Sequence, residues 1–368
     1  MRLVALCLAG LAALAACTPR PDIAVSPAAA QVGTEVPVYV GTTRRPGGDA
    51  IFQSARGSQI SYARIDVSIP PGHQPGQIEM TARAPDPAQH FMASHVAPQA
   101  GADAFRAELA GALARRSPAN REVLIYVHGF NNTFADGVFR TAQIGHDFDM
   151  PGVMVHYSWP SSGRPLGYAY DRDSVLFARD GLVALIEEVN RAGARRVLLV
   201  GHSLGAHLSM EALRQLSLKR GGSVAPLVDG VILISPDIDV DVFRSQARTI
   251  GHLPQPFVIF ASQRDRALAL SARLSGESNR LGNLDTVQKV ADLEVVVIDV
   301  SAYAGGDWLN HLTIAQSPAL IRLFSNIAAV EAAFSGDMAG RTGLLPGTVL
   351  TVQDATAIIL SPVSSLVQ

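Results

Sequence analysis

Only two cysteines, Cys7 and Cys17, occur in the 368 residues of this chain, and both lie near its N-terminus. A disulfide framework is therefore excluded for the rest of the chain, which must be stabilised by burial of a core. Basic residues are not in excess, because 30 Lys and Arg against 32 Asp and Glu give a formal charge of −2, so we expect no nucleic-acid partner. Metal-binding and nucleotide-binding spacings such as H-E-x-x-H, C-x-x-C, G-x-x-x-x-G-K and G-x-G-x-x-G are also missing, and we expect no metal, no nucleotide and no other cofactor.

The N-terminus has the pattern of an export signal. A positive start and an apolar run over residues 3–13 precede Leu14-Ala15-Ala16-Cys17, and the run is too short to span a bilayer. The Cys after Leu-Ala-Ala resembles the bacterial lipobox; an ordinary signal peptide is the alternative. The resemblance implies that residues 1–16 are a lipoprotein signal peptide and that Cys17 carries lipid that anchors the protein to a membrane of the cell envelope. Thr18 in place of Asp implies the outer membrane, with the protein facing the periplasm.

The remainder reads as one large domain between two less regular segments. Residues 17–33 are rich in Pro and Ala and predict a tether, residues 34–335 predict the domain, and residues 336–368 predict a tail of uncertain structure, in which 349–359 could form a strand. The first third predicts antiparallel strands at 36–40 and 60–69. After that, helical patterns alternate with strands that are apolar on both faces, which indicates a mostly parallel sheet with helices on both sides. The expected strands lie at 123–127, 153–159, 197–200, 231–234, 257–260 and 295–298, and the expected helices at 102–116, 133–148 and 174–189.

The segment Gly201-His202-Ser203-Leu204-Gly205 follows one of these strands and precedes an apolar stripe with helical spacing. A strand, a serine between two glycines and a helix form the nucleophile elbow of α/β-hydrolases. The turn is so sharp that Ser203 must adopt a strained backbone conformation, and side chains at Gly201 and Gly205 would collide with their neighbours. Ser203 is therefore the predicted nucleophile: the strain lifts its hydroxyl clear of the sheet, and the helix N-terminus beneath it favours negative charge.

An early strand ends in His128-Gly129-Phe130, a turn that resembles the oxyanion-hole loop of the same superfamily. The resemblance implies that the backbone N–H groups of Phe130 and Leu204 hold the oxyanion. Gly129 would allow the close approach of the backbone, and His128 would shape the loop without acting as the base.

The acid and the base are sought at later strand ends, because these residues follow the nucleophile in the order Ser, Asp, His. Asp265 follows the strand 257–260 and is the predicted triad acid; capping of a helix is its other interpretation. Asp237, one strand earlier, is the alternative acid. His311 is the last histidine in the chain and follows the last core strand, so it is the predicted general base.

Together these motifs resemble a bacterial family of esterase-like and lipase-like α/β-hydrolases of largely uncharacterised function, over residues 36–324. The resemblance implies an α/β-hydrolase fold and a serine hydrolase that cleaves a carboxylic ester through an acyl-enzyme. Thioesterase, amidase or acyltransferase activity would use the same triad, and a non-catalytic envelope binding or scaffold lipoprotein is the second class of function. Residues 240–253 are too short and too polar for a large lid, so we expect a small or medium ester as substrate, in a pocket lined by Phe130, Trp159 and residues near Trp308.

Overall fold

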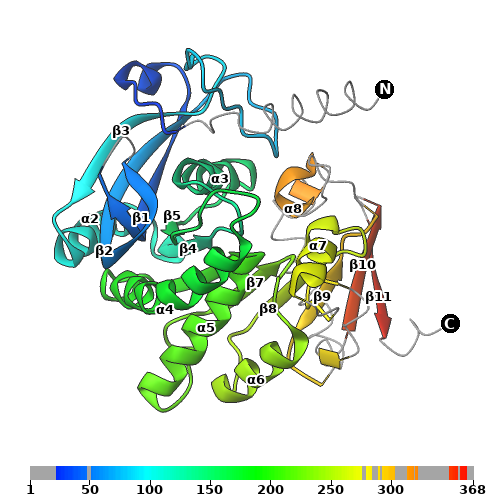
Figure 1. The fold of residues 1–368 in the computed structure, drawn as a ribbon. Coiled ribbons are helices and arrows are strands. Elements are labelled where there is room, and N and C mark those ends of the chain that lie inside the picture. The colour runs from blue at the N-terminus through cyan, green and yellow to red at the C-terminus, as the bar shows by residue number, and fades with distance from the viewer. Residues whose placement is uncertain are drawn as a thin grey trace, which may run out of the picture.

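The computed structural model describes residues 22–47, 51–275, 279–283, 289–290, 292–302, 313–318, 320–321, 348–354 and 357–362. These residues form an eleven-stranded sheet in the order β11-β10-β9-β8-β7-β6-β4-β5-β1-β2-β3, which twists through the centre of the molecule (Figure 1). The strands are β1 (Thr34–Pro46), β2 (Phe52–Ile69), β3 (Met92–Gln99), β4 (Glu122–Val127), β5 (Val153–Ser158), β6 (Arg196–His202), β7 (Gly230–Ile234), β8 (Phe257–Ala261), β9 (Val296–Asp299), β10 (Thr348–Asp354) and β11 (Ala357–Pro362).

The helices follow the strands alternately along the middle of the chain. They are η1 (Pro27–Gln31), α2 (Ala102–Ala114), η2 (Pro118–Asn120), α3 (Phe134–Asp147), α4 (Tyr168–Arg191), α5 (Leu204–Arg220), α6 (Val240–Ile250), α7 (Arg266–Ser275) and α8 (Thr313–Gln316). None of the helices in the described residues combines the length and the apolar character needed to cross a bilayer.

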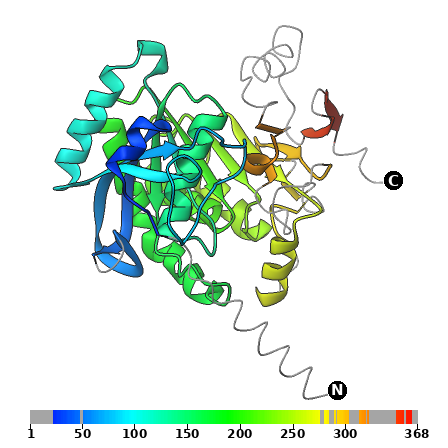
Figure 2. The same ribbon diagram turned by 90° about the horizontal axis from the view of Figure 1, so that it is seen from above.

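Helices cover both faces of the sheet because its central strands are apolar on both sides. Alternate strand residues such as Ile125 and Leu199 share one core with α2, α4, α5 and α6. Their neighbours, such as Leu124 and Val200, point to the opposite face, where α3 and α8 contribute Ile144 and Ala315. In Figure 1, α3 lies above the central strands and α4, α5 and α6 lie below them, and Figure 2 shows the blue to cyan N-terminal strands at the opposite end of the sheet from the orange and red strands. The prediction of a mostly parallel sheet covered on both faces is confirmed.

The N-terminal part is antiparallel, as predicted, since β1 pairs antiparallel with β2 and β2 pairs antiparallel with β3. The sequence analysis missed β3. This strand lies at the edge of the sheet, carries Pro98 and is only partly buried, so it lacks the apolar alternation that marks a core strand. It also missed the first turns of α4, where Tyr168 to Asp173 carry no apolar stripe.

Two terminal segments take part in the fold. In the expected tether, residues 22–33 are packed on the domain: the Ser26 N–H donates to the Ala93 carbonyl at 2.9 Å, and Ala29 is fully buried. Residues 22–33 of the predicted tether therefore contribute contacts to the domain. In the expected tail, β10 pairs parallel with β9 and antiparallel with β11, so this segment extends the sheet. Cys17 and the rest of residues 1–21 lie outside the described residues.

Candidate active site

Ser203 stands at the sharp turn between β6 and α5. Its backbone has φ 54° and ψ −123°, a strained conformation that non-glycine residues rarely adopt. A Cβ on Gly205 would lie 2.3 Å from the carbonyl oxygens of Val127 and His128, and a Cβ on Gly201 would lie 2.7 Å from the Cα of Ala206. The predicted strain and the predicted collisions are both present, and they follow from the tight packing of this turn against the end of β4 and the start of α5.

The turn after β4 lies directly against Ser203. A Cβ on Gly129 would come within 2.9 Å of the Ser203 Cβ and 2.6 Å of the His202 Nδ1. Within the described residues, no acceptor is found for the backbone N–H of Phe130 or of Leu204. The structure thus brings two available donors, one from the turn and one from the N-terminus of α5, to the neighbourhood of the serine.

His128 is fully buried inside the same turn. Its Nδ1 lies 2.9 Å from the Gly129 carbonyl oxygen and its Nε2 lies 3.1 Å from the Trp159 carbonyl oxygen. Burial, reinforced by the nearby Arg44 guanidinium, lowers the pKa of His128 well below its ordinary value, so the ring is neutral and donates one of these two bonds at a time. Both nitrogens face the backbone of the turns, which suits a residue that shapes the loop.

Trp159 also supports this turn. Its indole N–H donates to the His128 carbonyl at 2.7 Å, and its ring stacks on His128 with 4.9 Å between centroids. The side chain is fully buried, which corrects the expectation that it lines an open acyl pocket. Phe130 is partly exposed and packs edge-on against Tyr168 at 5.4 Å. Trp308 lies outside the described residues.

Two buried charges, which the sequence analysis did not single out, hold the turns around the serine. Arg44 donates from Nη2 to the Asn132 carbonyl at 2.9 Å, from Nη1 to the Ser161 carbonyl at 3.1 Å and from Nε to the Ser158 hydroxyl at 2.9 Å. Burial lowers the pKa of Arg44 to about 10, although Asp171 opposes this shift, so the side chain remains charged near neutral pH.

Asp171 complements Arg44 from the first turn of α4. It accepts hydrogen bonds from the Ser161 hydroxyl at 2.6 Å, the Ser162 N–H at 2.7 Å and the Asn131 N–H at 3.3 Å. The two charges therefore bind backbone groups of the same two turns, after β4 and after β5. The signal in the sequence is an arginine inside an apolar strand and an aspartate at a helix start. Both side chains are fully buried in the structure, and buried charges require specific partners.

The two candidate acids lie on the turns that follow β7 and β8. The Ser203 N–H donates to the Ile234 carbonyl and the Ser235 N–H donates to the Phe260 carbonyl, at 3.0 and 2.9 Å. These bonds align the ends of β6, β7 and β8 beside one another.

Asp237 and Asp265 differ in the groups that they bind. Asp237 accepts from the Ser271 hydroxyl at 2.7 Å and the Tyr168 hydroxyl at 2.8 Å, and it pairs with Arg280 at 3.3 Å. Asp265 accepts from the Leu268 N–H at 3.0 Å and so caps the start of α7. Both carboxylates are buried. His311, the predicted base, lies outside the described residues.

The other buried histidines have structural surroundings. His156 is fully buried in β5, where its Nδ1 donates to the Tyr126 carbonyl at 3.1 Å, and burial lowers its pKa to about 3. His207 lies on α5, and burial lowers its pKa as well.

Comparison with known proteins places the chain in a family. The model of an alpha/beta hydrolase family of unknown function (DUF900) matches residues 102–327, which is more than half of the chain and includes the turns after β4, β6, β7 and β8. The chain belongs to this family. Family membership and the strand order together show the α/β-hydrolase fold. No curated protein matches the chain.

Several solved structures are similar to the chain at low identity. One is an α/β serine hydrolase without a lid from Xanthomonas campestris, with 15% identity, a TM-score of 0.36 and coverage of 62% of this chain and 88% of that chain. A putative hydrolase from Agrobacterium vitis has 13% identity and a TM-score of 0.35 over 75% of this chain and 95% of that chain. An esterase from Pyrococcus furiosus has 14% identity and a TM-score of 0.33 over 58% of this chain and 82% of that chain. Likeness at this level concerns the fold alone.

Proposed function

We propose that this α/β-hydrolase is a serine hydrolase that cleaves a carboxylic ester through an acyl-enzyme. The observation that carries the proposal is the strained Ser203, which lies against the turn of Gly129, together with the N–H groups of Phe130 and Leu204, which have no acceptor among the described residues. A fold without catalysis has no use for such strain, because it costs about 1–3 kcal/mol.

In the proposed reaction, Ser203 attacks the ester carbonyl while His311 removes its proton. The N–H groups of Phe130 and Leu204 stabilise the oxyanion, and His311 then protonates the departing alcohol. Water then attacks the acyl-enzyme while His311 removes its proton. His311 returns this proton to the Ser203 oxygen as the carboxylic acid departs. Asp265 holds the imidazole of His311 and stabilises its charged form.

A fluorophosphonate probe tests this proposal on the full-length protein. We expect covalent labelling of the wild type, none in Ser203→Ala, and a strong decrease in His311→Ala. Ser235→Ala is a matched control, since Ser235 is also buried and has a positive φ of 44° at the end of β7, and it should be labelled like the wild type. Unchanged labelling of Ser203→Ala would overturn the assignment of the nucleophile, and absence of labelling in the wild type would favour a scaffold or binding protein.

We further propose that the substrate is a small or medium ester. Residues 240–250, where a lid would be inserted, form the short helix α6, whose Phe243 and Ala247 are buried in the core beside α5. Comparison of p-nitrophenyl esters from acetyl to palmitoyl should give the highest kcat/KM at the short end. Parallel assays with a thioester, an anilide and an acceptor alcohol decide between hydrolysis of esters and the thioesterase, amidase or acyltransferase alternatives.

We also propose that Cys17 anchors the enzyme to a membrane of the cell envelope, as the lipobox-like sequence suggests. Metabolic labelling with a clickable fatty acid should tag the wild type but not Cys17→Ser. Cys7→Ser is the matched control, because Cys7 lies within the proposed signal peptide and its loss should leave the label in place. Equal labelling of Cys17→Ser would contradict the anchor.

A further inference from the structure

Two histidines and an aspartate meet at the C-terminal end of α3, outside the catalytic turns. His73, from the loop between β2 and β3, directs its Nε2 to Asp147 Oδ1 at 2.8 Å, and His146 directs its Nδ1 to the same oxygen at 3.0 Å. The three candidate ligand atoms all lie within 4.8 Å of one another. The residues that meet here are 73 positions apart in sequence, so no short spacing motif could have revealed them.

On His73 and Asp147, the atoms that do not face this centre have hydrogen-bond partners of their own. The second ring nitrogen of His73 lies 2.9 Å from Glu79 Oε2, and the second oxygen of Asp147 accepts from the Gly76 N–H at 2.7 Å and from the Gln143 side-chain amide. Histidines that bind metals typically donate their other N–H to a carboxylate, and carboxylate ligands are themselves hydrogen-bonded. The cluster therefore has the outer contacts of a metal site in addition to three possible ligands.

The cluster is open to solvent on the side of His146. The side chains of His73 and Asp147 are only 4% and 1% exposed, whereas that of His146 is 36% exposed. An ion could enter past His146, and a water molecule could complete its coordination. Two imidazoles, one carboxylate and a water form a tetrahedral set that suits Zn²⁺, with bonds of about 2.0–2.2 Å. Ligand atoms of such a site lie somewhat farther apart than 2.8–3.0 Å, so a small opening of the present contacts would admit the ion.

We propose that His73, His146 and Asp147 bind one divalent metal ion, with Zn²⁺ the best match. This inference departs from the expectation of no metal, which rested on spacing motifs alone. It does not depend on the proposed esterase activity, since none of the three residues belongs to the catalytic turns.

The ion would have a structural role on the side of the molecule where α8 lies. Gly76, in the loop that carries His73, packs so closely on α8 that a Cβ there would lie 2.4 Å from the Gln316 carbonyl oxygen. Arg140 of α3 donates from Nη1 to the Gly76 carbonyl at 3.2 Å and to the Ala315 carbonyl at 3.4 Å. A metal that ties this loop to α3 would also steady the packing of α8.

Calorimetric titration of Zn²⁺ into full-length protein, purified without a histidine tag and stripped of metal, tests the inference. We expect one ion per chain and a Tm that rises by about 3–6 °C when free Zn²⁺ is 100-fold above the Kd. X-ray absorption of the zinc-loaded protein should show two imidazole ligands and light-atom distances near 2.0–2.1 Å.

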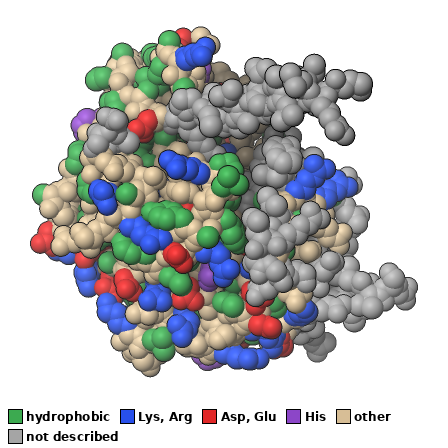
Figure 3. Space-filling view, in the orientation of Figure 1, with side chains coloured by type: hydrophobic (Ala, Val, Ile, Leu, Met, Phe, Trp, Pro, Cys, Tyr) green, Lys and Arg blue, Asp and Glu red, His purple; other side chains and the backbone are tan. Residues whose placement is uncertain are grey.

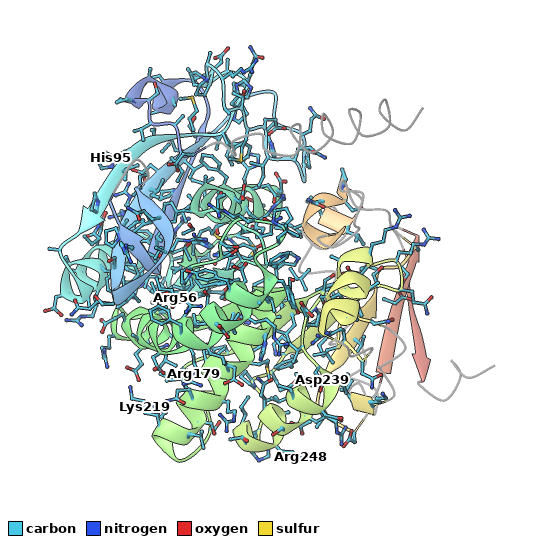
Figure 4. The ribbon with its side chains drawn as sticks, in the orientation of Figure 1. Arg56, His95, Arg179, Lys219, Asp239 and Arg248 are labelled. Carbon is cyan, nitrogen blue, oxygen red and sulfur yellow. The ribbon has the colours of Figure 1, made fainter. Side chains whose placement is uncertain are left out.

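Matched variants locate the ion. His146→Ala should weaken binding by at least about 100-fold, and Glu79→Gln by about 10–100-fold through loss of an outer contact. His95→Ala should bind like the wild type, because His95 lies on the edge strand β3 with a side chain that is 63% exposed (Figure 4). Circular dichroism should show that His146→Ala is folded, as expected for a partly exposed side chain. Failure of the wild type to bind Zn²⁺, or equal binding by His146→Ala, would overturn the inference and leave the cluster as an ion-pair network.

Discussion

The turns on the two sides of Ser203 are held in different ways. On the oxyanion side, the turns after β4 and β5 are fixed through their backbone: Arg44 binds carbonyl groups, Asp171 binds N–H groups, and Gly129 touches the elbow. On the acid side, the turns after β7 and β8 are fixed through carboxylate side chains, and Asp237 accepts from Tyr168 and Ser271 and pairs with Arg280.

This difference separates supporting residues from reacting ones. Where buried charges bind the backbone, the shape of the turn is set before any ligand arrives, which is what an oxyanion hole requires. On the acid side, the groups that a carboxylate binds indicate whether it supports the fold or is available to orient the base. Asp237 is bound on both oxygens by groups of α4, α7 and Arg280, so it is best suited to hold the floor of the site. Asp265 remains the predicted triad acid, with Asp237 as its alternative.

The largest effects on the acid side are expected from substitution of its two carboxylates. We expect Asp265→Asn to lower kcat by about 10⁴-fold, since the amide would hold the imidazole of His311 in the wrong tautomer. Asp237→Asn should keep most of its turnover but lose stability by about 3–5 kcal/mol, because the neutral amide no longer offers a negative charge to the buried Arg280. Ester hydrolysis and urea unfolding of both variants measure the two effects. A larger loss of kcat in Asp237→Asn would reverse the assignment.

On the oxyanion side, the largest effect is expected from substitution of Gly129. In Gly129→Ala the new Cβ would press on Ser203 and His202, so the turn must move away from the elbow. We expect kcat to fall by about 10²–10³-fold, as for the loss of one oxyanion donor. Gly111→Ala is the control, because the nearest atom to a Cβ at this position in α2 is 3.8 Å away, and it should keep full activity with a small gain in stability. Equal activity of the two variants would show that the turn does not hold the oxyanion.

The contrast between the two sides also explains what the sequence could predict. The elbow, the turn of Gly129 and the parallel strands were predictable because local chemistry determines them: glycines at fixed offsets and strands apolar on both faces. The roles of Arg44 and Asp171 were not, because their partners come from turns up to 117 positions away in sequence. The choice between Asp237 and Asp265 had the same limit, since both follow apolar strands and the partners of Asp237, such as Tyr168 and Ser271, come from other elements.

The sequence analysis missed the elements at the edge of the fold for another reason. β3 and the packed residues 22–33 bury one side at most, so their sequences resemble loops and linkers. On the face that Figure 3 shows, positive and negative side chains are interspersed among the coloured residues, so this face gives no further guidance.

A smaller effect is expected from replacing the buried Arg44 by lysine. The ammonium group of Arg44→Lys keeps the charge but cannot bind Asn132, Ser161 and Ser158 at once. A shift of the oxyanion turn by about 1 Å should lower kcat by about 10²-fold, with little change in KM.

Arg56→Lys is the matched control for Arg44. Arg56, labelled in Figure 4, also binds a hydroxyl and a carbonyl, but these belong to Ser174 and Tyr170 of α4 and not to the turns after β4 and β5. Its replacement should leave kcat unchanged. Equal kcat values for the two variants would show that the turn keeps its shape without the guanidinium.

The smallest predicted effect is a loss of stability in mild acid that arises on the oxyanion side. Burial lowers the pKa of His156 to about 3 in the folded protein, whereas an unfolded histidine titrates near 6.5. Below pH 6.5 the unfolded chain therefore binds a proton that the folded chain refuses, and stability falls by about 1.4 kcal/mol per pH unit from this one residue. His156→Gln should remove this slope between pH 6 and pH 4, because glutamine donates to the Tyr126 carbonyl but does not titrate. Urea unfolding of both proteins across this range gives the difference directly, and parallel curves would mean that His156 becomes protonated without unfolding the protein.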